Sequence, residues 1–251
     1  MIPAYWMQGE NFGDYLTVFI IRKLTDEDPR CVDPKGPEEH YFVTGSILGA
    51  SGPNSIIWGA GFSDHGQEIT AAKKILAVRG PKTRDRLRAL GFECPDLVGD
   101  PGLLLPYLYI PSDASKKYRL GVIPHWIDRP VVPECFTKMP DDIRVIDIMR
   151  KPHEVIDEIA QCERCISSSL HGIIASHAYG VPCQWVKFSD NILGDGFKYH
   201  DYFQSVGVPT DSLQALDLRN DFGSIEKLIQ GIPPAPEINA DDLWNSRPFG
   251  K

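Results

Sequence analysis

The sequence predicts an α/β protein built from two Rossmann-like αβα domains that face each other across a cleft. Short apolar runs of strand length alternate with segments of helical period, a pattern typical of parallel sheets covered by helices. The 251 residues suffice for one large domain or two of ordinary size. A segment rich in Pro, Ser and Lys at residues 106–118 is predicted to be a linker, which divides the chain into domains 1–112 and 113–251.

The first half contains a clear alternation of strands and helices. NFGDYLTVFIIRKLT indicates a loop that enters a helix, with Leu16 and Ile20 on its apolar face. YFVTGSILG and NSIIWGAGF each indicate a strand followed by a glycine turn. In KILAVRGPKTRDRLRALGF, a strand precedes a helix that begins at Pro81, a favourable first position, and stops at Gly91.

The second half repeats this alternation. Strands are predicted at residues 120–123, 145–148, 165–167 and 181–188. Helices are predicted in EVIDEIAQC, over residues 172–179, and from Lys198 and Ser224. Two such halves bring the carboxyl ends of their strands to one cleft, which is a usual place for a ligand.

Charge and cysteine usage exclude several classes of protein. The formal net charge of −8 argues against a nucleic acid as partner. No apolar run is long enough to cross a bilayer, and the N-terminal residues lack the features of a secretory signal, so a cytoplasmic protein is predicted. The six cysteines are interpreted as buried thiols. No metal site is predicted, because the CxxC pair Cys162 and Cys165 has no second pair or histidine cluster beside it.

The stretch ISSSLHG at residues 166–172 carries more hydrogen-bonding groups than a connection from strand to helix needs. A helix is expected to begin near Ser169 to His171, where free N–H groups and the positive end of the dipole favour a carboxylate or phosphate. Ser168 and Ser169 add hydroxyl donors, and Gly172 lets a ligand approach the backbone. His171 is suited to proton transfer near neutral pH. The alternative is an N-cap serine followed by a histidine that happens to lie in the first turn.

Four further segments carry candidate site residues, and each has a structural alternative. Asn11 to Asp14 (NFGD) is a polar turn before a helix, which is also what a helix cap requires. Arg79 ends a strand just before a helix, where a ligand-binding arginine is expected in an α/β cleft. His125 follows a strand directly and either faces the cleft or is structural. Asp100, in GDPGLLLP, belongs either to the site or to a turn.

Other glycine turns and histidines are not assigned to a site. The turns at Gly45–Ser46 and Gly59–Gly61 lack the complete pattern of a nucleotide-binding loop, so nucleotide cofactors are not predicted. The remaining histidines are interpreted as structural or surface residues: His40, His65, His153, His177 and His200.

Eight motifs occur in a fixed order: NFGDYLT, TGSIL, WGAGF, VRGPKTRDRL, GDPGLLLP, VIPHW, ISSSLHGIIASHAYGVP and FKYHDYFQSVG. This series resembles that of the polysaccharide pyruvyl transferase family, from about Asn11 to Gly207. Within the family, the chain is most similar to the short bacterial exopolysaccharide ketal-pyruvate transferases. The family's fold is similar to the two-domain arrangement of GT-B glycosyltransferases, which implies a GT-B-like fold for this chain.

The resemblance implies a reaction and its substrates. The enolpyruvyl group of phosphoenolpyruvate is transferred onto two hydroxyls of a sugar in an exopolysaccharide or cell-surface glycan precursor, which forms a pyruvate ketal and releases phosphate. Phosphoenolpyruvate is then a co-substrate and no cofactor is needed. The expected acceptor is a glycan or a lipid-linked oligosaccharide, through which the protein would associate peripherally with a membrane.

The resemblance also implies roles for the candidate residues. His171 is the candidate acid that protonates the methylene carbon of the donor. The N-terminal domain is interpreted as the acceptor side, and SSSLHG as the donor loop of the C-terminal domain. Donor binding is expected from Arg79, Ser168, Ser169, Leu170, Gly172, His125 and Lys198. The acceptor or phosphate side is expected to comprise Asn11, Gly13, Asp14 and Asp100.

The sequence departs from the family pattern at two places. Members can carry an arginine just before the Leu-His pair, where this chain has Ser169, and Arg79 or Lys198 is expected to compensate. The usual apolar first strand is reduced to IPAYWM. Two alternatives therefore stay open: a GT-B-type glycosyltransferase that uses a nucleotide sugar, and a non-catalytic carbohydrate- or phosphate-binding paralogue. The missing cation favours the second, and no ribose-binding acidic residue supports the first.

Overall fold

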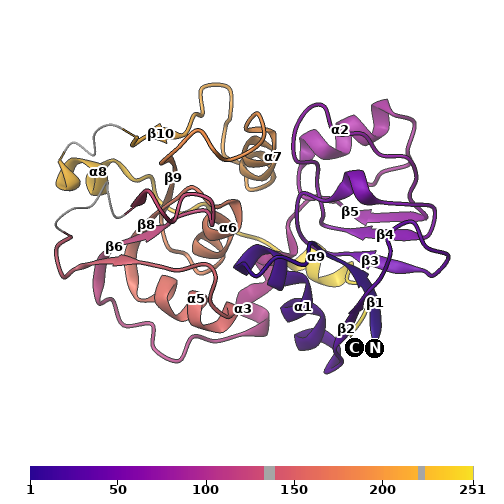
Figure 1. The fold of residues 1–251 in the computed structure, drawn as a ribbon, viewed down its shortest axis with the longest axis horizontal. Coiled ribbons are helices and arrows are strands. Elements are labelled where there is room, and N and C mark those ends of the chain that lie inside the picture. Colours follow the sequence, from indigo (N-terminus) through magenta and orange to yellow (C-terminus); the bar gives the residue numbers. More distant parts are fainter. Residues whose placement is uncertain (133–138, 220–223, 251) are drawn as a thin grey trace.

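The chain folds into two five-stranded parallel sheets, shown side by side in the computed structural model of Figure 1, which describes residues 1–132, 139–219 and 224–250. The first sheet has the order β2-β1-β3-β4-β5, and its strands are β1 (Ile2–Tyr5), β2 (Pro29–Cys31), β3 (His40–Phe42), β4 (Ser55–Trp58) and β5 (Lys74–Ala77). The second has the order β10-β9-β8-β6-β7, and its strands are β6 (Tyr118–Ile123), β7 (Ile143–Val145), β8 (Cys162–Ser167), β9 (Cys183–Lys187) and β10 (Leu216–Asp217). The predicted α/β class is confirmed.

Helices connect these strands, and local signals fix several of their ends. The helices are α1 (Phe12–Thr25), α2 (Pro81–Ala89), α3 (Leu105–Leu108), α5 (Pro152–Ala160), α6 (Leu170–Ala178), α7 (Phe197–Ser205), α8 (Ile225–Gly231) and α9 (Asp241–Asn245), with short 3₁₀ turns η1 (Leu48–Ala50) and η2 (Pro101–Leu104). Pro81 begins α2 as predicted, and Gly91 follows its end at a φ of +87°, a conformation that glycine adopts without strain.

The bounds predicted for the strand at 145–148 are wrong. β7 ends at Val145, and the backbone N–H of Ile146 makes one more bond, to the carbonyl of Val122 at 2.8 Å. Ile146 and Ile148 are apolar because they are buried in the hydrophobic core, so the apolar run extends past the strand.

A continuous hydrophobic core joins the two halves. Leu16 of α1 and Leu104 of η2 belong to the same buried cluster as Val155 of α5 and Ile174 of α6. Because helices from both halves share this cluster, the junction between the sheets is packed.

The C-terminal segment returns to the first sheet (Figure 1). Nε1–H of Trp58 in β4 donates to Oγ of Ser246 at 3.0 Å. The ring of Phe249 lies edge-on to that of Tyr41, with centroids 5.0 Å apart. The chain therefore leaves the first half before residue 118 and comes back to it at its end, while the domain division at 112 stays a prediction.

The described cysteines are free thiols and four of them are buried: Cys94, Cys162, Cys165 and Cys183. Cys31 is half-buried, and Cys135 lies outside the described residues. Among the described helices, none combines the length and the apolar character needed to span a membrane.

Candidate functional site

A cavity of about 720 Å³ lies where the carboxyl ends of the two sheets meet. Its walls come from the loops after β1 and β3 in the first half, and from the loops after β6 and β7 and the starts of α6 and α7 in the second. Parallel sheets place ligands at this end of their strands, since loops and helix N-termini converge there. The predicted site residues in the cavity wall are Asn11, Gly13, Asp14, His125, Ser169, Leu170, His171 and Lys198.

The first-half wall is built around the start of α1. Asn11 caps the helix, because its Oδ1 accepts the backbone N–H of Asp14 at 3.2 Å. Its Nδ2 donates to Oδ2 of Asp14 at 2.5 Å. Burial raises the pKa of Asp14, while the neighbouring His171 and the bond from Asn11 oppose the rise. The cap interpretation of NFGD is confirmed, and the same residues face the cavity.

The start of α6 forms the opposite wall. Ser169 is its N-cap, and its Oγ accepts the backbone N–H of Gly172 at 3.4 Å. The cap interpretation is therefore confirmed here too. Leu170 and His171 form the first turn, whose unpaired N–H groups and dipole favour an anion in the cavity.

The starts of α1 and α6 touch at Gly13. A Cβ atom at this position would overlap Nδ1 of His171, so only glycine lets the imidazole lie against α1. His171 is thereby held between the two halves of the chain, with its side chain 13% exposed. The close approach explains the glycine of NFGD better than a turn alone.

Ser168 and Gly172 lie behind the wall. Ser168 Oγ donates to Oδ2 of buried Asp128 at 2.6 Å and accepts the backbone N–H of His125 at 2.9 Å. A Cβ at Gly172 would lie 2.6 Å from Oγ of Ser167. The structure thus uses Ser168 to hold the His125 loop and Gly172 to pack α6 on β8, and it does not bring either residue into the cavity lining.

Two basic side chains of the second half face the cavity with shifted pKa values. Burial, then the nearby Lys198 and His171, lower the pKa of His125 to about 4. His125 is therefore neutral at neutral pH. Burial, then the charge of Arg79, lower the pKa of Lys198 to about 8, so Lys198 remains mostly charged at pH 7.

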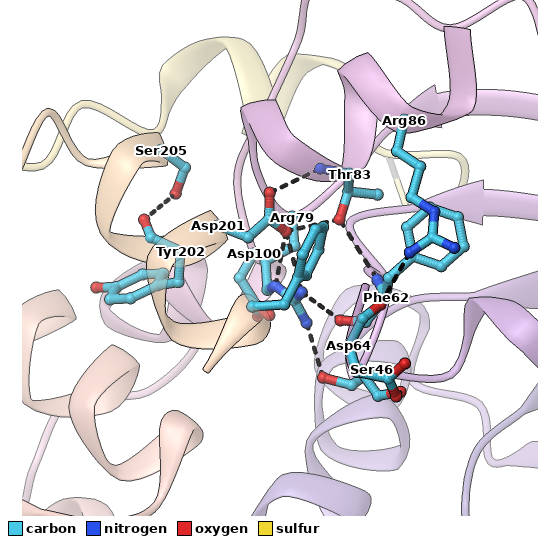
Figure 2. Close-up of polar contacts among 12 residues, drawn as sticks. Ser46, Phe62, Asp64, Arg79, Thr83, Arg86, Asp100, Asp201, Tyr202 and Ser205 are labelled. Carbon is cyan, nitrogen blue, oxygen red and sulfur yellow. Dashed lines mark hydrogen bonds and ion pairs between the residues drawn. The ribbon is translucent and has the colours of Figure 1, made fainter. Parts of the chain in front are cut away.

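Arg79 is fully buried and is not part of the cavity lining. Figure 2 shows its polar contacts. Its Nε donates to Asp201 of α7 at 3.0 Å, its Nη1 to Oγ of Ser46 at 2.8 Å and its Nη2 to the carbonyl of Phe62 at 2.6 Å. Asp201 also accepts the backbone N–H and the hydroxyl of Thr83. Of this cluster, Ser46 reaches the cavity, and the guanidinium does not.

Asp100 is also buried behind the wall. Its Oδ1 accepts the backbone N–H of Gly102 at 2.8 Å, which caps η2. Its Oδ2 lies 3.7 Å from Nε2 of His171. The turn interpretation is confirmed, and the residue also lies beside the histidine of the site.

Sequence reasoning missed two aromatic residues and one acid. Trp6 and Trp126 line the cavity, and Trp126 is 50% exposed. Asp128 fixes Ser168 from behind. The available signal was weak: Trp6 belongs to the reduced first strand IPAYWM, and Trp126 and Asp128 follow His125 in the loop after the strand predicted at 120–123. The other histidines lie outside the cavity lining: His40, His65, His153, His177 and His200.

Within the described ranges, no cluster of acidic, histidine or cysteine side chains could hold a metal ion. The cavity offers hydrogen-bond donors, one lysine, two histidines and the carboxylates of Glu10 and Asp14 at the meeting point of two helix starts. This arrangement suits an anionic ligand and a proton transfer.

One protein family and two known proteins resemble this chain in sequence. The sequence model of a family described as polysaccharide pyruvyl transferase matches residues 11–187. The chain is 32% identical over 215 residues to the uncharacterized protein L143 of Acanthamoeba polyphaga mimivirus, covering 82% of this chain and 75% of that one. It is 27% identical over 220 residues to the succinoglycan biosynthesis protein ExoV of Rhizobium meliloti, covering 83% of this chain and 66% of that one. No solved structure matches.

Proposed function

The chain belongs to the polysaccharide pyruvyl transferase family, and from this premise we propose that it transfers the enolpyruvyl group of phosphoenolpyruvate onto two hydroxyls of a sugar in a glycan precursor. The product is a pyruvate ketal, and phosphate is released. The observation that carries the proposal is His171 at the start of α6, which lines a cavity between the sheets together with Asn11 and Asp14.

Phosphoenolpyruvate carries a carboxylate and a phosphate, so its site must supply positive potential. The first turn of α6 offers free N–H groups at Leu170 and His171, and Lys198 offers an ammonium group on the same wall. Among the described residues lining the cavity, Lys198 is the one lysine or arginine. Either Arg79 or Lys198 was expected to compensate for the arginine that Ser169 replaces, and we assign this role to Lys198.

His171 supplies the proton that starts the reaction. The π electrons of the methylene carbon take this proton to form a methyl group, and the adjacent carbon becomes an electrophile. One sugar hydroxyl adds to it, the C–O bond to phosphate breaks with its electron pair on oxygen, and the second hydroxyl closes the ketal. One hydroxyl proton reloads His171 and the other leaves with the phosphate, so the histidine is regenerated.

The acceptor is proposed to lie toward Trp6 and Trp126. An exposed indole face beside polar groups suits the apolar face of a sugar ring. We also propose that the two halves form a GT-B-like pair of domains. The free thiols support a reducing, cytoplasmic location for the reaction. No cofactor is part of this scheme, and a lipid-linked acceptor would bring the protein to a membrane surface.

The test is an assay of the purified protein with phosphoenolpyruvate and a panel of lipid-linked or nitrophenyl hexosides. We expect phosphate release that depends on the acceptor, together with a product that has gained the mass of a pyruvate ketal. His171→Ala should lower turnover by about 10²–10⁴-fold, because the proton donor is lost. His153→Ala, which removes an exposed histidine outside the cavity, is the matched control and should leave turnover unchanged.

Other outcomes would reject the proposal. Sugar transfer from a nucleotide sugar, with no phosphate released from phosphoenolpyruvate, identifies a glycosyltransferase. A His171→Ala variant with near-normal turnover removes the histidine from the acid role.

A non-catalytic phosphate- or carbohydrate-binding protein is the second candidate. It is favoured by the single lysine in the described cavity lining and by Ser169 in the position where family members can carry arginine. Calorimetric binding of phosphoenolpyruvate without turnover on any acceptor would support it.

A further inference from the structure

Two buried polar atoms without a partner lie next to each other behind the cavity wall. Five buried side-chain nitrogen or oxygen atoms in the described residues have no hydrogen-bond partner. Oδ2 of Asp100 and Nε2 of His171 are two of these five, and they lie 3.7 Å apart. The side chain of Asp100 is fully buried.

An isolated pair of this kind is costly unless the two atoms serve each other. A buried carboxylate oxygen without a donor loses its hydration and regains nothing. The separation of 3.7 Å is too long for a hydrogen bond, but a shift of the ring by under about 1 Å would close it. Bonds between catalytic groups are often long before substrate binds.

The two residues come from different halves of the chain and are held firmly. Asp100 is fixed by its bond to the backbone of Gly102. A Cβ at Gly102 would lie 2.9 Å from Ile174, so η2 rests directly on α6, the helix that carries His171. The carboxylate is thus presented to the imidazole by packed backbone.

The orientation of the ring separates its two nitrogens. Nε2 is buried toward Asp100, whereas Nδ1 lies against Gly13, which lines the cavity. A proton held on Nε2 by the carboxylate leaves Nδ1 as the nitrogen that exchanges protons with a ligand.

We propose that Asp100 is a positioning residue for His171, which accepts Nε2–H, fixes the tautomer and points Nδ1 into the cavity. Its kinetic consequence rests on the proposed function. Asp100 then stabilises the doubly protonated ring before Nδ1 gives its proton to the methylene carbon. This role differs from a place on the acceptor or phosphate side, which the resemblance implied.

The first test needs no substrate. Nitrogen-15 NMR of histidine-labelled protein reports which nitrogen of neutral His171 carries the proton. We expect Nε2–H in the wild type. In Asp100→Asn, the amide oxygen keeps the cap on Gly102 and its NH₂ group faces the ring, so the proton should move to Nδ1.

The second test is kinetic. Asp100→Asn should lower kcat by about 10²–10⁴-fold, as for loss of general acid catalysis, while the KM for phosphoenolpyruvate stays within about twofold. Asp33→Asn is the matched control. Asp33 is exposed, and its Oδ1 likewise accepts a backbone N–H two residues on, from Lys35 at 2.9 Å.

The two tests separate this inference from the proposed function. A wild-type proton on Nδ1, or the same tautomer in wild type and Asp100→Asn, overturns the role of Asp100. This wild-type measurement also decides the matter if the variant does not fold. A tautomer switch in a protein that releases no phosphate with any acceptor supports the pairing and rejects the transferase.

Discussion

Two buried aspartates at the junction of the two halves have opposite surroundings. Asp201 accepts hydrogen bonds from the guanidinium of Arg79 and from both the backbone and the hydroxyl of Thr83 (Figure 2). Asp100 accepts one backbone N–H, and its second oxygen has no hydrogen-bond partner among the described residues. Nε2 of His171 lies 3.7 Å from that second oxygen.

The difference separates a group that builds the site from one that takes part in it. Arg79 and Asp201 bond to each other and to Phe62, Ser46 and Thr83, and neither of the two charged side chains lines the cavity. The cluster instead positions the wall, since Arg79 binds Ser46 and Asp201 follows Lys198 on α7. Asp100 keeps a free oxygen, and this capacity becomes useful when the ring of His171 carries a second proton.

The largest expected effect comes from breaking the Arg79 cluster, which comprises Arg79, Asp201, Thr83, Ser46 and Phe62. Arg79→Met removes the charge and leaves Asp201 buried without its ion pair, which should lower the free energy of unfolding by about 3–5 kcal/mol. Denaturant unfolding followed by circular dichroism measures the change.

Arg84→Met is the control for this prediction. Arg84 lies on α2, the helix that follows Arg79, but its partners Asp85 and Asp96 are 64% and 86% exposed, so the change should stay within about 1 kcal/mol. An Arg79→Met protein as stable as wild type, with only a raised KM for phosphoenolpyruvate, would contradict the structural role. It would restore the donor-binding role that the resemblance implied.

The contrast also shows what could be predicted from the sequence. Pro81 and Ser169 mark helix starts, because caps and first-turn prolines act within a few residues. The partner of Arg79 is 122 residues away, and no local pattern reveals it. A strand-end arginine looks the same whether it holds a ligand or an aspartate, so its role could not be read from position alone.

Eight candidate residues do line one cavity, because parallel strands carry their following loops to the same edge. The pairing of Asp100 with His171 could not be predicted, since it depends on how η2 rests on α6. The return of the C-terminal segment to the first half was also missed, because it too depends on contacts between residues far apart in the sequence. The hydrogen bond from Trp58 to Ser246, for example, joins residues that are 188 positions apart.

A smaller effect is expected from displacing His171 without touching its charge. Gly13→Ala puts a methyl group where Nδ1 now lies, so the ring must rotate away from the cavity and from Asp100. A misplacement of about 1 Å lowers turnover by about 100-fold. Stability should change by under about 1 kcal/mol, because alanine is the better helix residue and the clash is with a movable side chain.

Gly231→Ala tests whether this effect is specific. Gly231 ends α8 with open space around it, so neither turnover nor stability should fall. Normal turnover in Gly13→Ala would show that the position of the ring does not limit the reaction, and the contrast between the two aspartates would lose its catalytic meaning.

The smallest expected effect is a change in KM with pH, caused by the titration of Lys198, which lines the cavity and lies near the Arg79 cluster. Its pKa is lowered to about 8, first by burial and then by Arg79, so the ammonium is charged below pH 8 and neutral above it. The KM for phosphoenolpyruvate should therefore rise roughly tenfold between pH 7 and pH 9, at the low end for a charge-assisted hydrogen bond. Lys198→Arg stays charged and should abolish the rise. Arg79→Met removes a neighbouring charge and should move the rise to higher pH. The same rise in Lys198→Arg would show that another group titrates. The Arg79 cluster would then not set the pH dependence of donor binding.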